Sequence, residues 1–273
     1  MKRIQFFNNW HNGDVHMSRE YVKDLMNIFG PDNEFYYHHK NNKKVLEDID
    51  NLIYSSVPVE NCDVNIDTWI GQNMSLGLYS GCNFKSYHNV MSKVYKDLNI
   101  FDKFKDIGYY IPSINYEKLN IYKIKEFFKK DKKYVLISNN FVLSGQAPNI
   151  PMNCLIEMLA NNNPNIIFIA TNSEEGKILK DNIIYCDDLT EKGFNLNEIS
   201  YISTLCNVIV GRSSGAYSFS IVKENMNKDK SIVCFCNLEQ DCWKCDGEEN
   251  IIWSNNYDIG YMSYLIQKEI DKY

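Results

Sequence analysis

Residues 207–217 combine a short apolar strand with a turn of small and polar residues that is typical of phosphate-binding sites. Residues 208–210 favour a β-strand, and the residues from Ala216 onward favour a helix. This strand–turn–helix arrangement directs backbone N–H groups and a helix N-terminus at one point, where an anion is stabilised. The candidate donors in the turn are Arg212 with its forked guanidinium, Ser213, Ser214 and Gly215. The segment therefore predicts an anionic, nucleotide-bearing ligand, with an ordinary α/β turn as the alternative.

A second concentration of polar residues spans residues 8–19, which we expect to form a loop between a strand at 4–7 and a helix at 18–29. Loops at the carboxyl ends of parallel strands form ligand crevices. Gly13 permits a tight turn, and Asp14 then precedes the helix. A carboxylate in that place is able to take a proton from an acceptor hydroxyl, which makes Asp14 the candidate general base. The alternative role is stabilisation of the N–H groups that begin the helix.

Three further side chains in this segment are candidates for the same crevice. His16 is a second candidate catalytic group, and His11 and Arg19 are candidates for contact with the acceptor or with an anion. Their structural alternatives are the lining of a polar pocket for the histidines and a surface ion pair for Arg19. The histidines and Asp14 also have the chemistry of metal ligands, but no metal site is expected here.

Four of the nine cysteines cluster near the end of the chain, at positions 234, 236, 242 and 245. A tetrathiolate zinc site is one interpretation of Cys234, Cys236, Cys242 and Cys245. Alternation along the strand-like run 231–236 places Cys234 and Cys236 on one face, where cysteine is a common small core residue. Buried thiols are therefore the favoured interpretation.

The elements that position these residues alternate between strand and helix along the chain. Apolar runs predict strands at 4–7, 34–38, 52–55, 63–69, 133–138, 165–170, 182–186, 208–210 and 231–236. Helical spacing predicts helices at 18–29, 86–98, 151–160, 173–180, 197–206, 216 to about 225, and 259–270. Repeated β–α units with apolar strands indicate an α/β fold with parallel sheets covered on both faces. We expect two domains, at 1–125 and 126–273. Asn139 and Asn140 follow the first strand of the second domain and, with Gly13, are further candidates for contact with the phosphates of the ligand.

Composition excludes several classes of protein. The net charge of −6 and the absence of a long basic block predict no nucleic-acid partner. No apolar run approaches the ~20 residues of a membrane span, and no signal peptide is visible, so the expected location is the cytoplasm. A peripheral membrane contact through surface aromatics stays compatible with the sequence.

Two separated segments resemble one known family. Gly13-Asp14-Val15-His16 resembles the opening motif of the bacterial lipopolysaccharide heptosyltransferases, glycosyltransferase family 9, in which the Asp of a Gly-Asp pair is the general base. The segment 189–217 resembles the family's donor-site segment, where a Ser-Gly pair opens a helix at the donor diphosphate and is matched here by Ser214-Gly215. Ser213 stands where the family has Asp, and no His follows the pair, so the heptose donor is not specified.

The resemblance implies a GT-B fold, in which two Rossmann-like domains with parallel sheets face each other across a cleft. It further implies an inverting, metal-independent glycosyltransferase that uses no cofactor and moves a sugar from a nucleotide-sugar donor to a glycan or other hydroxyl acceptor. The N-terminal domain would offer Asp14 to the acceptor, and the C-terminal domain would bind the donor. Two alternatives stay open, a nucleotide-sugar epimerase of this fold and a non-catalytic nucleotide- or sugar-binding protein.

Overall fold

The computed structural model describes residues 1–40, 43–72, 74–104, 110–173, 175–191, 195–213, 215–227, 229–244 and 250–273. The chain divides into two compact units, with a boundary between Asn115 and Tyr116. The first unit also takes in Trp243 and Lys244 from near the end of the chain. Residues 116–125 pack with the second unit, where the Tyr116 hydroxyl lies 3.0 Å from the Ser200 hydroxyl. The boundary therefore lies before the expected position at 125/126.

The described part of the first unit is built on a parallel sheet. Its elements are β1 (Arg3–Phe7), α1 (Asn12–Phe29), β2 (Glu34–His38), the 3₁₀ turn η1 (Lys43–Leu46), β3 (Leu52–Ser55), β4 (Val64–Asp67), η2 (Met74–Leu76), α2 (Phe84–Asp97) and η3 (Phe101–Lys103). The strand order is β3-β2-β1-β4, and β1 pairs in parallel with both of its neighbours. Ile4, Gln5 and Phe6 of β1 are all buried, because β1 is a central strand of the sheet and is covered on both faces. Tyr21 of α1 lies against Tyr87 of α2, with ring centroids 5.1 Å apart, so the two helices pack against each other.

Helix α1 begins earlier than predicted. The expected loop at 8–19 is wrong from residue 12 onward, because α1 starts at Asn12 and not at Ser18. Gly13 is therefore a helical residue and not the pivot of a tight turn. The Asp14 carboxylate accepts a hydrogen bond from the backbone N–H of His11, the residue that precedes the helix, at 3.3 Å. This contact and the favourable position of an acidic residue in the first turn offset the poor helix propensity of Gly13.

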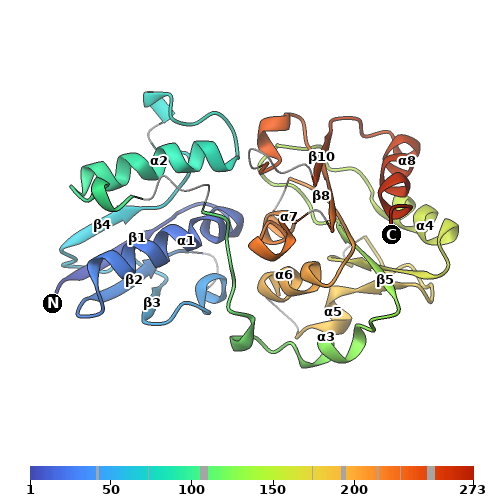
Figure 1. Cartoon of the computed structure of the whole chain (residues 1–273), viewed down its shortest axis with the longest axis horizontal. Helices are drawn as coiled ribbons and strands as arrows, with labels where there is room; N and C mark the ends of the chain where they lie inside the picture. The colour runs from blue at the N-terminus through green and yellow to red at the C-terminus, as the bar shows by residue number, and fades with distance from the viewer. Residues whose placement is uncertain are drawn as a thin grey trace. The chain divides into compact units, whose positions relative to one another are not determined.

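The second unit contains a larger parallel sheet. Its elements are η4 (Tyr116–Lys118), α3 (Tyr122–Phe127), β5 (Lys133–Ser138), α4 (Asn153–Asn162), β6 (Ile166–Ala170), β7 (Ile183–Tyr185), α5 (Cys186–Leu189), α6 (Leu196–Thr204), β8 (Val208–Arg212), α7 (Gly215–Phe219), η5 (Lys223–Asn225), β9 (Ser231–Phe235), η6 (Glu239–Asp241), β10 (Ile251–Ser254) and α8 (Ile259–Ile270). The strand order is β10-β9-β8-β5-β6-β7, and every neighbouring pair is parallel. Helices α4 and α8 pack side by side against this sheet (Figure 1), and Leu155, Ile156 and Met262 join its apolar core. The predicted parallel α/β architecture is confirmed in both units.

Two local expectations for the second unit are wrong, and one strand was not predicted. The predicted helix at 173–180 is absent from the described residues of that segment, because Gly176 adopts the left-handed region at φ 91° and interrupts it. The helix after the turn is short, since α7 ends at Phe219 and only the 3₁₀ turn η5 follows it. Strand β10 was not predicted, although Ile251, Ile252 and Trp253 favour it.

Candidate functional site

Polar side chains occupy the carboxyl ends of the strands in the first unit. His39, directly after β2, contacts the backbone oxygen of Asn8 through Nδ1 at 2.8 Å and the side-chain oxygen of Asn12 through Nε2 at 3.1 Å. These contacts tie the end of β2 to the end of β1 and to the first residue of α1. Burial lowers the pKa of His39, so its imidazole favours the neutral form. Asn8 belongs to the polar segment 8–19, and His38-His39 also ends a predicted strand at this edge, although neither Asn8 nor His39 was among the predicted site residues.

Asp14 lies in the first turn of α1, which follows β1, and it is half-buried. Burial raises the pKa of the Asp14 carboxyl above its ordinary value, and the neighbouring His11 partly opposes this rise. A raised pKa is the property that a carboxylate needs to accept a proton near neutral pH. The position and the electrostatics of Asp14 are thus compatible with the predicted role of a general base.

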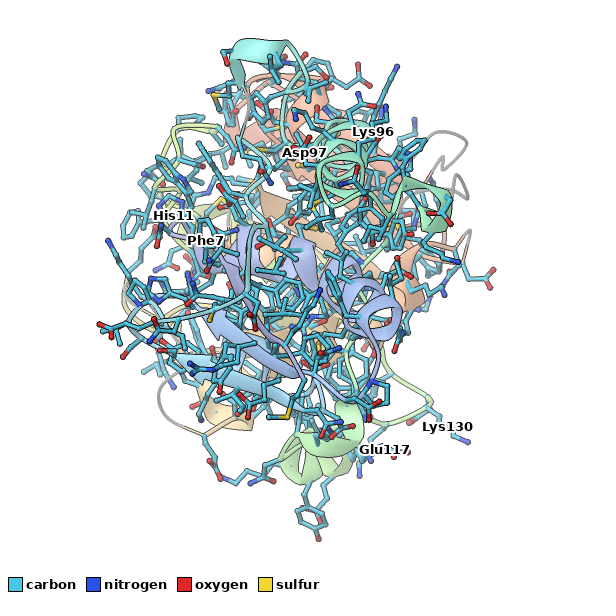
Figure 2. All side chains as sticks on the ribbon, turned by 90° about the vertical axis from the view of Figure 1, so that its left-hand side faces the viewer. Phe7, His11, Lys96, Asp97, Glu117 and Lys130 are labelled. Carbon is cyan, nitrogen blue, oxygen red and sulfur yellow. The ribbon has the colours of Figure 1, made fainter. Side chains whose placement is uncertain are left out.

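The other predicted residues of this segment have different environments. His11 is exposed and precedes α1, where Figure 2 labels it together with Phe7, the last residue of β1. His16 is fully buried, so an acceptor hydroxyl does not reach its imidazole in this structure. This burial favours a structural role for His16 over the predicted catalytic one.

Arg19 differs from both expectations, because it is neither on the surface nor open to an acceptor. Its guanidinium is fully buried and forms an ion pair with Asp48 just after η1, whose side chain is also fully buried. The second Asp48 oxygen accepts the backbone N–H of Asn115 at 3.0 Å. Asp48 and Asp50 also have the Asp-x-Asp spacing of a metal-binding motif, which the sequence analysis overlooked. Because Asp48 is committed to Arg19 and Asn115, this pair does not present two carboxylates to a metal ion.

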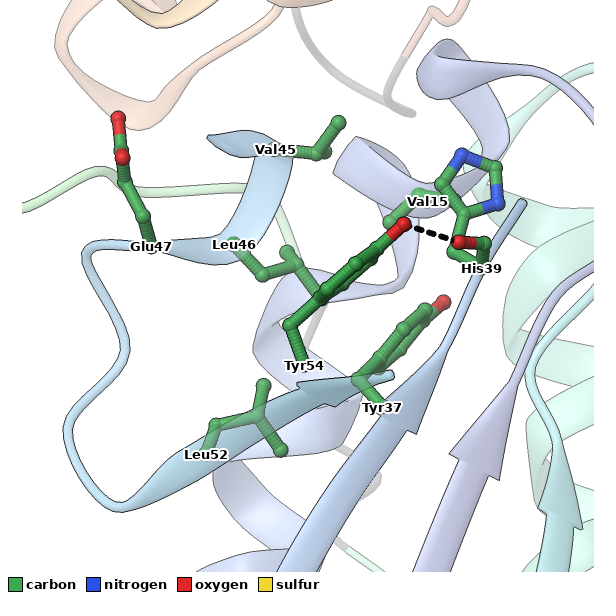
Figure 3. A pocket seen from close by; sticks show the side chains of 8 residues that line it. All are labelled: Val15, Tyr37, His39, Val45, Leu46, Glu47, Leu52 and Tyr54. Carbon is green, nitrogen blue, oxygen red and sulfur yellow. Dashed lines mark hydrogen bonds between the residues drawn. The ribbon is translucent and has the colours of Figure 1, made fainter. Parts of the chain in front are cut away.

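A cavity of about 330 Å³ lies beside the ends of β2 and β3 (Figure 3). It is lined by Val15, Tyr37, His39, Val45, Leu46, Glu47, Leu52 and Tyr54. The Tyr54 hydroxyl donates to the backbone oxygen of His39 at one wall of this cavity. Aliphatic and aromatic walls with a few polar groups are typical of a small-molecule pocket. β1 is the neighbour of β2 in the sheet, and α1 follows β1 in the chain. The start of α1 therefore lies close to the β2 and β3 ends that line this cavity.

A network of amides and hydroxyls connects the carboxyl ends of β5 and β6 in the second unit. The Asn139 side chain donates to the backbone oxygen of Asn172 at 2.8 Å and accepts the backbone N–H of the same residue at 2.8 Å. The Thr171 hydroxyl donates to the side-chain oxygen of Asn140. The structure therefore brings the predicted Asn139 and Asn140 together with Thr171 and Asn172, which the sequence analysis missed. Their position after the buried strand 166–170 was the available signal.

Arg212, the last residue of β8, is fully buried, and its predicted contact with a phosphate stays a prediction. Its guanidinium donates to four backbone carbonyls, those of Asn139 at 3.0 Å, Asn140 at 2.7 Å, Pro148 at 3.2 Å and Ile150 at 3.3 Å. Burial lowers the pKa of Arg212, an effect too small to remove its charge. Arg212 thus holds the segment 139–150 against the end of β8.

The rest of the predicted turn is partly buried and partly open. Ser213 is buried, and its hydroxyl donates to the backbone oxygen of Asp241 at 2.7 Å, so it too is engaged within the fold. An added Cβ at Gly211 would lie 3.0 Å from Tyr217 of α7, which explains a glycine in β8. By contrast, an added Cβ at Gly215, the first residue of α7, meets no atom within 4 Å. Ser214 lies outside the described residues.

The clustered cysteines are core residues where the structure describes them. Cys234, Cys236 and Cys242 are fully buried. The Cys242 thiol donates to the backbone oxygen of Glu239 at 2.8 Å, and burial raises the pKa of Cys234. Cys245 lies outside the described residues, and within the described ranges no three His, Cys, Asp or Glu side chains are grouped as metal ligands. Nor does the described part of the chain contain a helix with the length and apolar character of a membrane span.

Comparison with solved structures identifies the class of fold. A family 9 glycosyl transferase from Veillonella parvula superposes with a TM-score of 0.59 at 12% identity, covering 99% of this chain and 89% of the other. The E. coli ADP-heptose lipopolysaccharide heptosyltransferase II gives 0.55 at 11% identity, over 100% and 99% of the two chains. E. coli heptosyltransferase WaaC, solved with ADP, gives 0.53 at 12% identity, over 99% and 98%. No family model matches the sequence, and no curated protein matches it significantly.

These likenesses extend over nearly the whole chain and over nearly the whole of each neighbour. The chain therefore has the two-unit α/β fold of the family 9 glycosyltransferases, and the predicted GT-B fold class is confirmed. At 11–12% identity the likeness concerns the fold, and the chemistry has to be argued from this chain's own residues.

Proposed function

We propose that this protein is an inverting, metal-independent glycosyltransferase that moves a sugar from a nucleotide-sugar donor to a hydroxyl acceptor. The observation that carries the proposal is the position of Asp14. The heptosyltransferase-like fold spans the chain, and within it a half-buried carboxylate with a raised pKa lies in the first turn of α1, directly after β1.

The proposed reaction is a single displacement. The Asp14 carboxylate takes the proton of an acceptor hydroxyl, and the hydroxyl oxygen attacks the anomeric carbon of the donor sugar. The bond between that carbon and the diphosphate oxygen breaks, and its electron pair leaves with the nucleoside diphosphate. Attack opposite the leaving group inverts the anomeric configuration. The charge that develops on the diphosphate requires fixed N–H donors or cations in place of a metal ion.

We assign the donor to the carboxyl edge of the second unit, between the ends of β5 and β8. Arg212 and Asn139 hold the backbone there through bonds within the fold, so they act as positioning residues. The open space over Gly215 leaves room for a phosphate to approach the backbone at the start of α7. The neighbour WaaC, whose structure contains ADP, supports a nucleoside diphosphate as the ligand class.

Thermal shift with ADP, GDP, UDP, CMP and their sugars tests this assignment, because a ligand specific for the folded state raises the Tm. We expect one nucleoside diphosphate and its sugar to stabilise the protein. Gly215→Ala has space for its methyl group and should melt no lower than the parent chain, yet bind that ligand about tenfold more weakly, a loss of ~1.4 kcal/mol. Gly260→Ala, in the first turn of α8, is the control for a glycine-to-alanine change far along the chain and should bind normally, although its added Cβ lies 3.2 Å from the capping Asp258 carboxylate and its Tm is compared separately. The assignment is wrong if no nucleotide shifts the Tm or if both variants bind like the parent.

A further inference from the structure

Two tryptophans stack at the carboxyl ends of adjacent strands in the first unit. The indole rings of Trp10, after β1, and Trp69, after β4, are nearly parallel, with centroids 4.4 Å apart and 19° between their planes. Trp10 is 47% exposed, although tryptophan is usually mostly buried. The pair therefore presents a broad aromatic surface at the same edge of the sheet as Asp14.

The same kind of hydrogen bond fixes the backbone of both tryptophans. The N–H of Trp10 donates to the side-chain oxygen of Asn8 at 3.0 Å, and the N–H of Trp69 donates to the side-chain oxygen of Asp67 at 2.9 Å. One turn starts at Asn8, directly after β1, and the other starts at Asp67, the last residue of β4. Gly71 adds a second constraint, because an added Cβ there would lie 2.3 Å from the Trp69 ring. The indoles are thus held in place before any ligand binds, which lowers the entropy cost of binding.

The groups around the indoles favour a neutral polyhydroxyl ligand over a nucleotide. The segments 8–16 and 66–72 contain no Lys or Arg, whereas each contains an aspartate, Asp14 and Asp67. Carboxylates repel phosphate but accept hydrogen bonds from hydroxyl groups. A pyranose ring carries C–H groups on one face and hydroxyls at its rim, and an aromatic face with a negative quadrupole attracts those C–H groups.

We propose that the stacked indoles of Trp10 and Trp69 form a carbohydrate platform that seats one sugar ring of the acceptor next to Asp14. The role of this platform as an acceptor site depends on the proposed glycosyltransferase function. Its preference for carbohydrate depends only on the indoles and the carboxylates. Trp10 lies edge-on to His11, with ring centroids 6.4 Å apart, and His11 directly precedes the helix whose first turn carries Asp14, so a sugar ring on Trp10 would lie beside this segment.

Direct binding tests the platform without reference to catalysis. Maltotriose, cellotriose and chitotriose are titrated by calorimetry, with sorbitol as a polyol that has no ring face. We expect at least one trisaccharide to bind and sorbitol not to bind. Trp10→Ala should weaken that binding at least tenfold and Trp10→Phe less, whereas Trp253→Phe, in β10 of the second unit, should not change it. The platform is refuted if no trisaccharide binds, if sorbitol binds equally well, or if Trp10→Ala binds like the parent.

Kinetics separate failure of the platform from failure of the proposed function. With an active donor, Trp10→Ala should raise the KM for a glycan acceptor at least tenfold, whereas the control Trp253→Phe should leave that KM unchanged. An unchanged acceptor KM contradicts the platform alone. If the parent chain neither transfers nor hydrolyses any nucleotide sugar, but Trp10→Ala still loses trisaccharide binding, the platform stands and the glycosyltransferase proposal fails.

Discussion

Arg212 offers a quantitative test of how the proposed donor edge is held together. The structure predicts that Arg212→Met, which keeps an unbranched apolar stem but removes the guanidinium donors, loosens the segment 139–150. Two of the four carbonyl contacts, those to Asn139 and Asn140, are 3.0 and 2.7 Å long and charge-assisted, a class worth ~1.5–3 kcal/mol each. The contacts to Pro148 and Ile150, at 3.2 and 3.3 Å, contribute less.

The net effect is smaller than the sum of these contacts. Removing the buried guanidinium also removes the cost of its desolvation, and water can reach part of the released backbone. We therefore expect a loss of about 2–4 kcal/mol in the free energy of unfolding. Arg212→Lys should recover part of this loss, because a single ammonium group cannot span both pairs of carbonyls.

Urea denaturation measures the stability, and limited proteolysis measures the looseness of the segment. Phe141 and Leu143 are 50% and 82% exposed, so a chymotrypsin-like protease can reach them once the backbone opens. Cleavage there should accelerate in Arg212→Met, and nucleoside diphosphate binding should weaken with it. An Arg212→Met variant with unchanged urea midpoint and unchanged cleavage would refute the positioning role.

Two further predictions concern the carboxylates of Asp14 and Asp48 in the first unit. Burial raises the pKa of Asp14 in the folded chain, so the stabilisation from its bound proton is complete below the unfolded pKa and is lost as pH rises through the folded pKa. The Tm of Asp14→Asn minus the Tm of the parent chain should therefore increase from pH 4 to pH 8. Calorimetric scans in which this difference decreases would contradict the burial argument. Asp48→Asn leaves the buried Arg19 without its counter-charge and should cost about 3–5 kcal/mol in urea unfolding, while the double variant Arg19→Met/Asp48→Leu should cost less. Equal losses in the single and double variants would contradict this.

Much of the fold follows from local pattern. The strands β2 and β5 and the helix α8 have the predicted bounds. After its first residue, β5 is a continuous run of buried residues, whereas the buried residues of α8 recur with helical spacing. The start of α1 was missed because Asn12, Gly13 and Asp14 individually favour loops, and a contact with His11 reverses that preference. Strand β10 is short, and its pairing with β9 is a tertiary contact that local pattern does not contain.

The sequence positions of the candidate site residues were predictable, but the structural roles of these residues were not. Residue type identified Arg19 and Arg212 as cations, but the partners that bury them, Asp48 and the carbonyls of 139–150, are distant in sequence. Trp10 and Trp69 were not singled out, because their stacking depends on the adjacency of β1 and β4 in the sheet. Side chains that follow parallel strands are thus recognisable from sequence, while their burial and partners require the fold.

The rate of transfer by Asp14→Asn tests the central proposal most directly. The parent chain and the variant are incubated with the nucleotide sugar identified by thermal shift and a glycan acceptor, and nucleoside diphosphate release and the anomeric configuration of the product are measured. We predict an inverted product, no loss of rate on addition of EDTA, and a rate for Asp14→Asn that is lower by ~10²–10⁴-fold while the donor still binds. A retained anomeric configuration, or transfer by Asp14→Asn at the parental rate, would contradict the role of Asp14 as the general base.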